Sequence, residues 1–211
     1  MGKGVGRVVN DIVNDIAGKT LHAAHMARWH AHVNALNVSP QMVDWLRNRD
    51  SLTARLVAHS QRFRVQRLQQ GIALCAPDEC AQIYPEVGRQ HGRKALAREV
   101  ILRCDEQAVV YAHTVMPLQA NASQWPRFAG LGEKSLGSTL FNDPLVARGA
   151  LSFARLPYTH RFMRRIRDLQ LFSEQDLPNM YARRSLFQRQ GACLLVTEVF
   201  LPGMRALGVV P

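Results

Sequence analysis

The most apolar stretch of the chain is Cys193–Pro202, where both alternating faces are almost entirely hydrophobic. Its length, with Gly191 before it and a proline at its end, is typical of a strand. A strand that is apolar on both faces lies in the middle of a covered sheet. Glu198 is the exception, because it shares a face with Val196 and Phe200. A carboxylate aimed at a buried surface needs a partner, a proton or a ligand.

Further runs with a period of two predict the other strands. They start at Phe63 and continue at 95–102, 108–116, 150–156 and 181–188. The short connections Asp105-Glu106-Gln107 and Gln190-Gly191 are typical of hairpins. The pattern therefore predicts an α+β fold in which five or six strands form a single, mainly antiparallel sheet.

Capping residues and helical spacing predict short helices before and between the strands. Ser39-Pro40 opens one helix, because serine caps an N-terminus and proline suits the first helical position. Asp50-Ser51-Leu52-Thr53 begins another, with Leu52 directed inward. A glycine-flanked turn at 131–137 leads into a third helix, and 161–167 predicts a fourth. Residues 76–93, rich in proline, glycine and charge, predict a loop.

The first residues differ from the rest of the chain. A glycine-rich start is followed by Val8, Ile12 and Ile16 at helical spacing. We interpret residues 1–36 as a partly helical N-terminal extension and residues 37–211 as the main domain.

Composition narrows the class of protein. With 211 residues, 47% of them hydrophobic, the chain is long enough for one well-covered core. No apolar run approaches the roughly 20 residues of a membrane span. Asp11 and Asp15 argue against a secretory signal. The four cysteines show no metal-ligand spacing, so we expect reduced thiols and a cytoplasmic protein.

Basic side chains outnumber acidic ones by 27 to 16, which gives a net charge of +11. This excess favours an anionic partner without selecting among nucleic acid, lipid headgroups and small polyanions. The densest basic run, Arg161–Arg167, fits either a solvated helix face or an anionic surface partner. Few aromatic residues are interleaved with these arginines, so we expect no nucleic-acid partner.

A second charge lies on an otherwise apolar strand face. Arg98 is in phase with Leu96, Val100 and Leu102. Arginine cannot lose its proton in a protein, so an anion should meet it. Two interpretations remain open: Arg98 and Glu198 bind a ligand, or they form a buried ion pair with each other.

Three groups of motifs, in matching order and spacing across residues 40–202, resemble the chorismate pyruvate-lyase family of bacterial ubiquinone biosynthesis. Each motif alone is weak, but all of them in register are fairly specific. They are Trp45-Leu46 with Asp50-Ser51-Leu52-Thr53; Arg98-Glu99-Val100-Ile101-Leu102 with Thr114-Val115-Met116-Pro117, Leu131-Gly132 and Leu136-Gly137; and Arg183-Arg184-Ser185 with Leu195-Val196-Thr197-Glu198-Val199-Phe200-Leu201-Pro202.

The resemblance implies a six-stranded antiparallel sheet with helices that cover an enclosed ligand cavity. It implies cleavage of chorismate to 4-hydroxybenzoate and pyruvate, with no metal and no organic cofactor. The ligand-binding arginine and glutamate of the family correspond to Arg98 and Glu198, which would be both catalytic and substrate-binding. Its remaining contacts correspond to Leu52 and Leu136, where Leu52 replaces a methionine; a contact through the backbone N–H would tolerate that change.

One alternative is a non-catalytic small-molecule-binding domain of the same fold, as in the sensor domains of transcription regulators. Residues 1–40 contain no recognisable helix-turn-helix, which argues against it. The expected partner is chorismate, and a monomer is expected. A peripheral contact with an anionic membrane or a membrane prenyltransferase remains a hypothesis that rests on the basic run.

Overall fold

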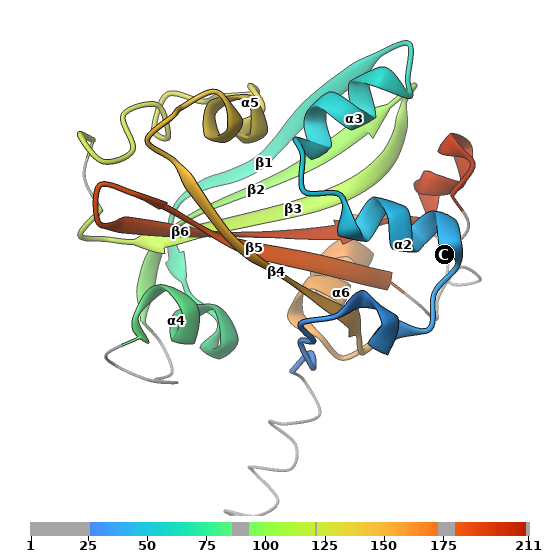
Figure 1. The fold of residues 1–211 in the computed structure, drawn as a ribbon, viewed down its shortest axis with the longest axis horizontal. Helices are drawn as coiled ribbons and strands as arrows, with labels where there is room; N and C mark the ends of the chain where they lie inside the picture. The colour runs from blue at the N-terminus through green and yellow to red at the C-terminus, as the bar shows by residue number, and fades with distance from the viewer. Residues whose placement is uncertain (1–25, 86–92, 121, 173–179, 210–211) are drawn as a thin grey trace, which may run out of the picture.

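The computed structural model describes residues 26–85, 93–120, 122–172 and 180–209. Within them, six strands form one sheet whose neighbouring strands are all antiparallel, in the order β1-β2-β3-β6-β5-β4 (Figure 1). The predicted α+β fold with an antiparallel sheet is therefore confirmed. The strands are β1 (Phe63–Leu74), β2 (Lys94–Cys104), β3 (Gln107–Pro117), β4 (Ala147–Leu156), β5 (Met180–Arg189) and β6 (Ala192–Phe200).

The apolar strand of the sequence is β6, and it lies in the middle of the sheet between β3 and β5. Leu194 and Leu195, which point to opposite faces, are both buried. The same is true of Val199 and Phe200. The prediction of a central strand covered on both faces is confirmed. Successive hydrophobic side chains of a strand point to opposite faces, so all of them are buried only when both faces are covered.

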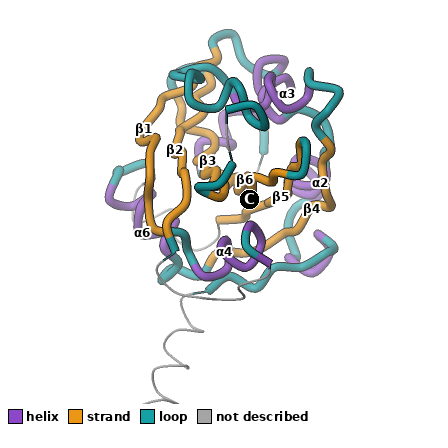
Figure 2. The backbone as a smooth tube through the Cα atoms, turned by 90° about the vertical axis from the view of Figure 1, so that its left-hand side faces the viewer, coloured by secondary structure: helices purple, strands orange, loops and turns teal. Residues whose placement is uncertain are grey.

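Short helices cover the two faces of this sheet (Figures 1 and 2). On the face that carries Glu198 lie the 3₁₀ helix η1 and the helices α2, α3 and α5; helices α4 and α6 pack on the other. The bounds are η1 (Val33–Leu36), α2 (Pro40–Arg47), α3 (Leu52–Ala58), α4 (Pro77–Ile83), α5 (Leu136–Phe141), α6 (Arg161–Asp168) and a C-terminal 3₁₀ helix η4 (Pro202–Leu207).

Capping residues begin the helices as the sequence predicts. The side chain of Ser39 accepts a hydrogen bond from the N–H of Met42 at the start of α2. The side chain of Ser51 does the same for Ala54 in α3. Leu52 is buried, as predicted. These caps fix where each short helix begins, and so where its first N–H groups point.

The prediction of a loop over residues 76–93 is wrong for residues 77–83, which form helix α4. Pro77 occupies a first-turn position, where its missing N–H costs nothing. The carboxylate of Glu79 accepts a hydrogen bond from the N–H of Ala76, and Cys80 and Ile83 are buried against the sheet. Proline and acidic residues therefore mark a helix start here, and residues 86–92 lie outside the described part.

The described end of the N-terminal segment packs on the sheet. His30 pairs with Phe153 at the edge strand β4 through two backbone hydrogen bonds of 2.8 Å. Ala27, Val33 and Leu36 are buried. The predicted helical pattern at residues 8–16 lies outside the described residues, so the division at residues 36 and 37 stays a prediction.

Two arginines of the basic run in α6 meet buried acids. Arg161 lies 3.0 Å from the carboxylate of Glu79, and Arg165 lies 2.9 Å from that of Glu99. These two side chains are therefore partly solvated and also bound to acids of the sheet and of α4. No helix in the described ranges is long and apolar enough to cross a membrane. All four cysteines, each of them described, are free thiols.

Gly203 offers a test of the packing between η4 and β3. A methyl group at this position would lie 2.2 Å from the carbonyl oxygen of Ala108. Because that oxygen belongs to the backbone, no change of side-chain rotamer can relieve the clash. We expect Gly203→Ala to lower the free energy of unfolding by about 3 kcal/mol, measured by urea denaturation. Gly130→Ala, in open space, is the matched control and should change it by less than about 0.5 kcal/mol. Equal effects would contradict the packing described.

Glu79 predicts a pH dependence of stability. Burial raises the pKa of its carboxyl, but His113, whose Nδ1 lies 2.6 Å away, and Arg161 outweigh burial and lower it to about 2. A lowered pKa in the folded state stabilises the protein above the unfolded value of about 4.5, and this stabilisation is lost as the pH falls towards 2.

We therefore expect Glu79→Gln to lower the free energy of unfolding by about 3–5 kcal/mol at pH 7 and by much less near pH 3. Urea denaturation at both pH values measures the effect. Glu133→Gln, which changes an exposed carboxylate, is the control. A loss for Glu79→Gln that does not depend on pH would contradict the assignment.

Candidate active site

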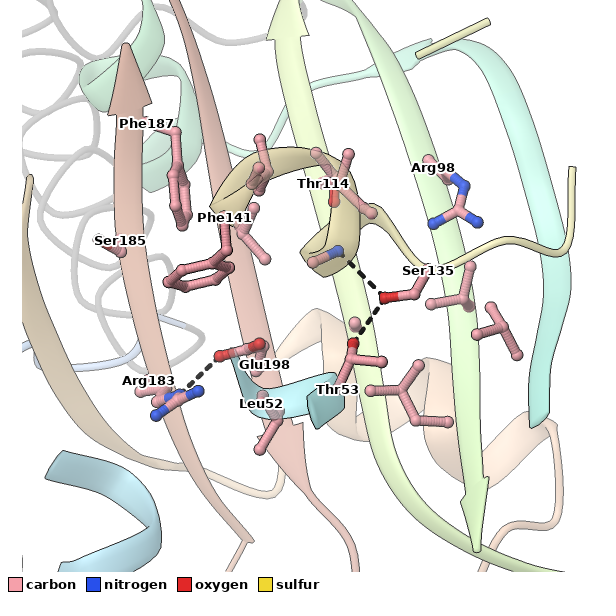
Figure 3. Close-up of a pocket in the computed structure, with 18 of the residues that line it drawn as sticks. Leu52, Thr53, Arg98, Thr114, Ser135, Phe141, Arg183, Ser185, Phe187 and Glu198 are labelled. Carbon is pink, nitrogen blue, oxygen red and sulfur yellow. Dashed lines mark hydrogen bonds and ion pairs between the residues drawn. The ribbon is translucent and has the colours of Figure 1, made fainter. Parts of the chain in front are cut away.

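A cavity of about 50 Å³ lies between the sheet and the first turns of α3 and α5 (Figure 3). A space of this kind, closed in by one sheet and two short helices, suits a small molecule and not a polymer. Leu52, Arg98, Leu136 and Glu198, the four residues singled out from the sequence, all line it.

Arg98 enters the cavity from β2 and is only 2% exposed. Its Nη2 donates to the carbonyl oxygens of Gly132 (3.1 Å) and Lys134 (2.9 Å), while its buried Nε has no partner. No carboxylate of the described residues lies within ion-pair distance of it. Burial, followed by repulsion from Arg67, lowers its pKa to about 10. The guanidinium therefore stays charged at neutral pH, and a buried charge of this kind favours an anionic ligand.

Glu198 reaches the same cavity from β6 but pairs with a different arginine. Its Oε2 accepts a hydrogen bond of 2.6 Å from Nε of Arg183 on the neighbouring strand β5 (Figure 3). Oε1 accepts no hydrogen bond within the described part of the chain. The alternative of an Arg98–Glu198 ion pair is therefore wrong, and both side chains keep hydrogen-bonding capacity for a ligand.

Arg183, which the sequence analysis did not assign to the site, ties Glu198 to the helix layer. It is fully buried, and its Nη1 donates to the carbonyl oxygens of Trp45, Leu46 and Asn48 at the C-terminal end of α2. A cation at this end also suits the helix dipole. The side chain thus orients the carboxylate of Glu198 and anchors α2 over the sheet.

The first turns of α3 and α5 meet at the cavity. The hydroxyls of Thr53 and Ser135 lie 2.5 Å apart, and Ser135 also accepts a hydrogen bond from the N–H of Gly137 (Figure 3). A methyl group on Gly137 would lie 2.9 Å from the Thr53 hydroxyl. Glycine therefore permits this close approach of the first turns of α3 and α5, from which Leu52 and Leu136 both reach the cavity.

Arg148 of β4 is a further cavity residue that the sequence analysis missed. Its Nε donates to the hydroxyl of Ser185 (3.3 Å) and its Nη1 to the carbonyl oxygen of Arg49 (2.5 Å). The predicted strand began at residue 150 and so left Arg148 out, and a bulge between Arg148 and Leu151 also hides its face from the sequence pattern. Simple alternation from Leu151 places Arg148 on the opposite face, whereas the extra residue returns it to the cavity face.

Comparison with known proteins identifies the family. The sequence model described as chorismate lyase matches residues 23–206. The chain belongs to the chorismate lyase family. The probable chorismate pyruvate-lyases of three bacteria are similar to this member of the family. That of Cupriavidus pinatubonensis is 45% identical, with 79% of this chain and 84% of the relative covered. Those of Ralstonia nicotianae (41% identical, 87% and 85% covered) and Nitrosospira multiformis (38% identical, 89% and 99% covered) follow.

Among solved structures, this chorismate lyase family member is similar to PhnF from Mycobacterium smegmatis, with 14% identity, a TM-score of 0.48 and 74% and 65% of the two chains covered. It is also similar to the C-terminal domain of the histidine utilization repressor from Pseudomonas syringae, with 10% identity, a TM-score of 0.47 and 67% and 92% covered.

Arg183 provides a test of the hydrogen bonds that link Glu198 to the end of α2. Arg183→Met leaves the carboxylate of Glu198 and three main-chain oxygens without their donor. We expect it to lower the free energy of unfolding by about 3–5 kcal/mol, measured by urea denaturation. Arg155→Met, which changes an exposed arginine on β4, is the control and should cost less than about 0.5 kcal/mol. A small loss for Arg183→Met would show that the pair does not support the fold.

Proposed function

We propose that the protein eliminates pyruvate from chorismate to give 4-hydroxybenzoate, the first step towards ubiquinone. The observation that carries this proposal is that one small cavity contains both Arg98, a buried guanidinium without an ion-pair partner among the described residues, and Glu198. Membership of the chorismate lyase family supports the same reaction. The proposed catalytic and substrate-binding residues are those predicted from the sequence.

The ring carboxylate of chorismate is assigned to Arg98. The unpartnered Nε and a terminal nitrogen of a guanidinium can hold a carboxylate with two parallel hydrogen bonds. The first-turn N–H groups of Leu52 and Leu136 are the further proposed donors, because the caps Ser51 and Ser135 bond to Ala54 and Gly137 instead.

The ring hydroxyl, opposite the carboxylate across the ring, is assigned to Glu198. Strand β3 separates β2 from β6, so the backbones that carry Arg98 and Glu198 are about 10 Å apart. Side chains that reach inward over that span can hold the two ends of one six-membered ring. Glu198 would accept a hydrogen bond from the hydroxyl on the ring carbon that loses its proton.

The reaction needs only bond rearrangement within the substrate. The ether bond between the ring and the enolpyruvyl group breaks, and the neighbouring ring carbon that bears the hydroxyl loses its proton. The electron pair of that C–H bond completes the aromatic ring, and the three-carbon fragment takes up a proton to become pyruvate. Since aromatisation drives the reaction, the protein has to orient the ring and assist the proton transfer.

The decisive experiment is incubation of the purified protein with chorismate while 4-hydroxybenzoate is followed by absorbance. Formation of the product supports the lyase. Binding of chorismate without turnover would instead support the sensor-type, non-catalytic alternative.

Location and partners belong to the same proposal. A cytoplasmic enzyme that acts as a monomer is consistent with the free cysteines and with a cavity lined by one chain. The peripheral membrane or prenyltransferase contact stays a prediction. Its proposed basis is weaker than the sequence suggested, because Arg161 and Arg165 are engaged by buried acids.

Glu198→Gln tests the role of the carboxylate. The amide keeps an oxygen for Arg183 but removes the charge, so we expect the variant to stay folded while kcat falls about 10²–10⁴-fold. Initial rates with chorismate measure the effect, and circular dichroism checks the fold. Glu133→Gln is the control for a carboxylate outside the cavity. A folded Glu198→Gln with unchanged kcat would remove Glu198 from the reaction.

A further inference from the structure

The cavity wall carries more positive charge than the ring carboxylate alone requires. Its charged side chains are three arginines, Arg98, Arg148 and Arg183, and one acid, Glu198. Arg183 is neutralised by Glu198. The wall therefore has an excess of two positive charges, on Arg98 and Arg148, and neither has an ion-pair partner among the described residues.

Arg98 and Arg148 lie at opposite ends of the cavity. They extend from β2 and β4, which are four strand spacings apart, or at most about 19 Å along the sheet. Figure 3 shows Ser185 and Phe187, which contact Arg148, on the side away from Arg98. One carboxylate cannot bridge the two guanidinium groups, so the geometry fits a ligand with two separate anionic groups.

The surroundings of Arg148 hold its charge in place and leave it able to bind. Its guanidinium carbon lies 5.4 Å from the ring centre of Phe141 and 5.3 Å from that of Phe187. One hydrogen bond fixes Nε and another fixes Nη1, while Nη2 donates no hydrogen bond within the described ranges. A cation held beside two aromatic rings provides a partly desolvated binding site for a carboxylate on a small unsaturated group.

We propose that Arg148 binds the carboxylate of the enolpyruvyl group, the part of chorismate that departs as pyruvate. This inference rests on the proposed function, and it assigns the second charge of the dianion. Arg98 then contacts a group that substrate and product share, whereas Arg148 contacts a group that only the substrate carries. The two arginines should therefore separate substrate binding from product binding.

The test compares KM for chorismate with the inhibition constant of 4-hydroxybenzoate in Arg148→Met, Arg148→Lys and Arg98→Lys. For Arg148→Met we expect a KM for chorismate about 10–100-fold higher, because a charge-assisted hydrogen bond is lost. The inhibition constant of 4-hydroxybenzoate should change less than about 2-fold. Arg148→Lys keeps the charge and should recover part of the loss. Arg98→Lys should weaken both ligands. Arg155→Met, on the same strand but outside the cavity, should change neither.

An unchanged KM for both Arg148 variants, or equal losses for chorismate and 4-hydroxybenzoate, would overturn the assignment. If Arg148→Met does not fold, Arg148→Lys decides by the same comparison. Failure of the proposed function is distinguishable, since the unaltered protein would then release no 4-hydroxybenzoate from chorismate.

Discussion

The ion pair between Arg183 and Glu198 is the interaction on which the site depends. It joins the neighbouring strands β5 and β6, and through Arg183 it reaches the carbonyl oxygens that end α2. Both groups are largely removed from water, so each needs the other to offset the cost of burial. As a result, the carboxylate offered to a ligand has one oxygen fixed and one available. A preorganised group of this kind loses little freedom when a ligand binds.

The helix layer over this pair is assembled from very short elements that could not persist alone. Helices α3 and α5 have seven and six residues, well below the length at which isolated helices are stable in water. They are held by their serine caps, by Leu52, Leu56 and Leu140 in the core, and by the Thr53–Ser135 contact. The cavity exists because a rigid sheet forms its base and these small, capped helices form its cover.

Much of the fold followed from local pattern alone, because a period of two and hairpin turns are direct consequences of strand geometry. Arg98 and Glu198 were found for a related reason: a charge on an apolar strand face is costly unless something binds it. Helix α4 was missed because proline and acidic residues occur both in loops and in first helical turns. Arg183 was missed because 27 basic residues make a single arginine uninformative. Its partners at residues 45–48 are far away in sequence, and only the folded chain brings them together.

The bulge in β4 has a consequence for how this family could change its ligand. Arg148 faces the cavity only because one additional residue separates it from Leu151 relative to the partner strand. A deletion of one residue at position 149 or 150 would leave Arg148 two residues from Leu151 in a regular strand, so the guanidinium would still face the cavity. A change that kept the length of β4 but made its pairing regular would instead turn the guanidinium to the opposite side. Evolution could thus convert a pocket for doubly charged acids into one for singly charged acids by altering the backbone of β4, without replacing any side chain in the pocket.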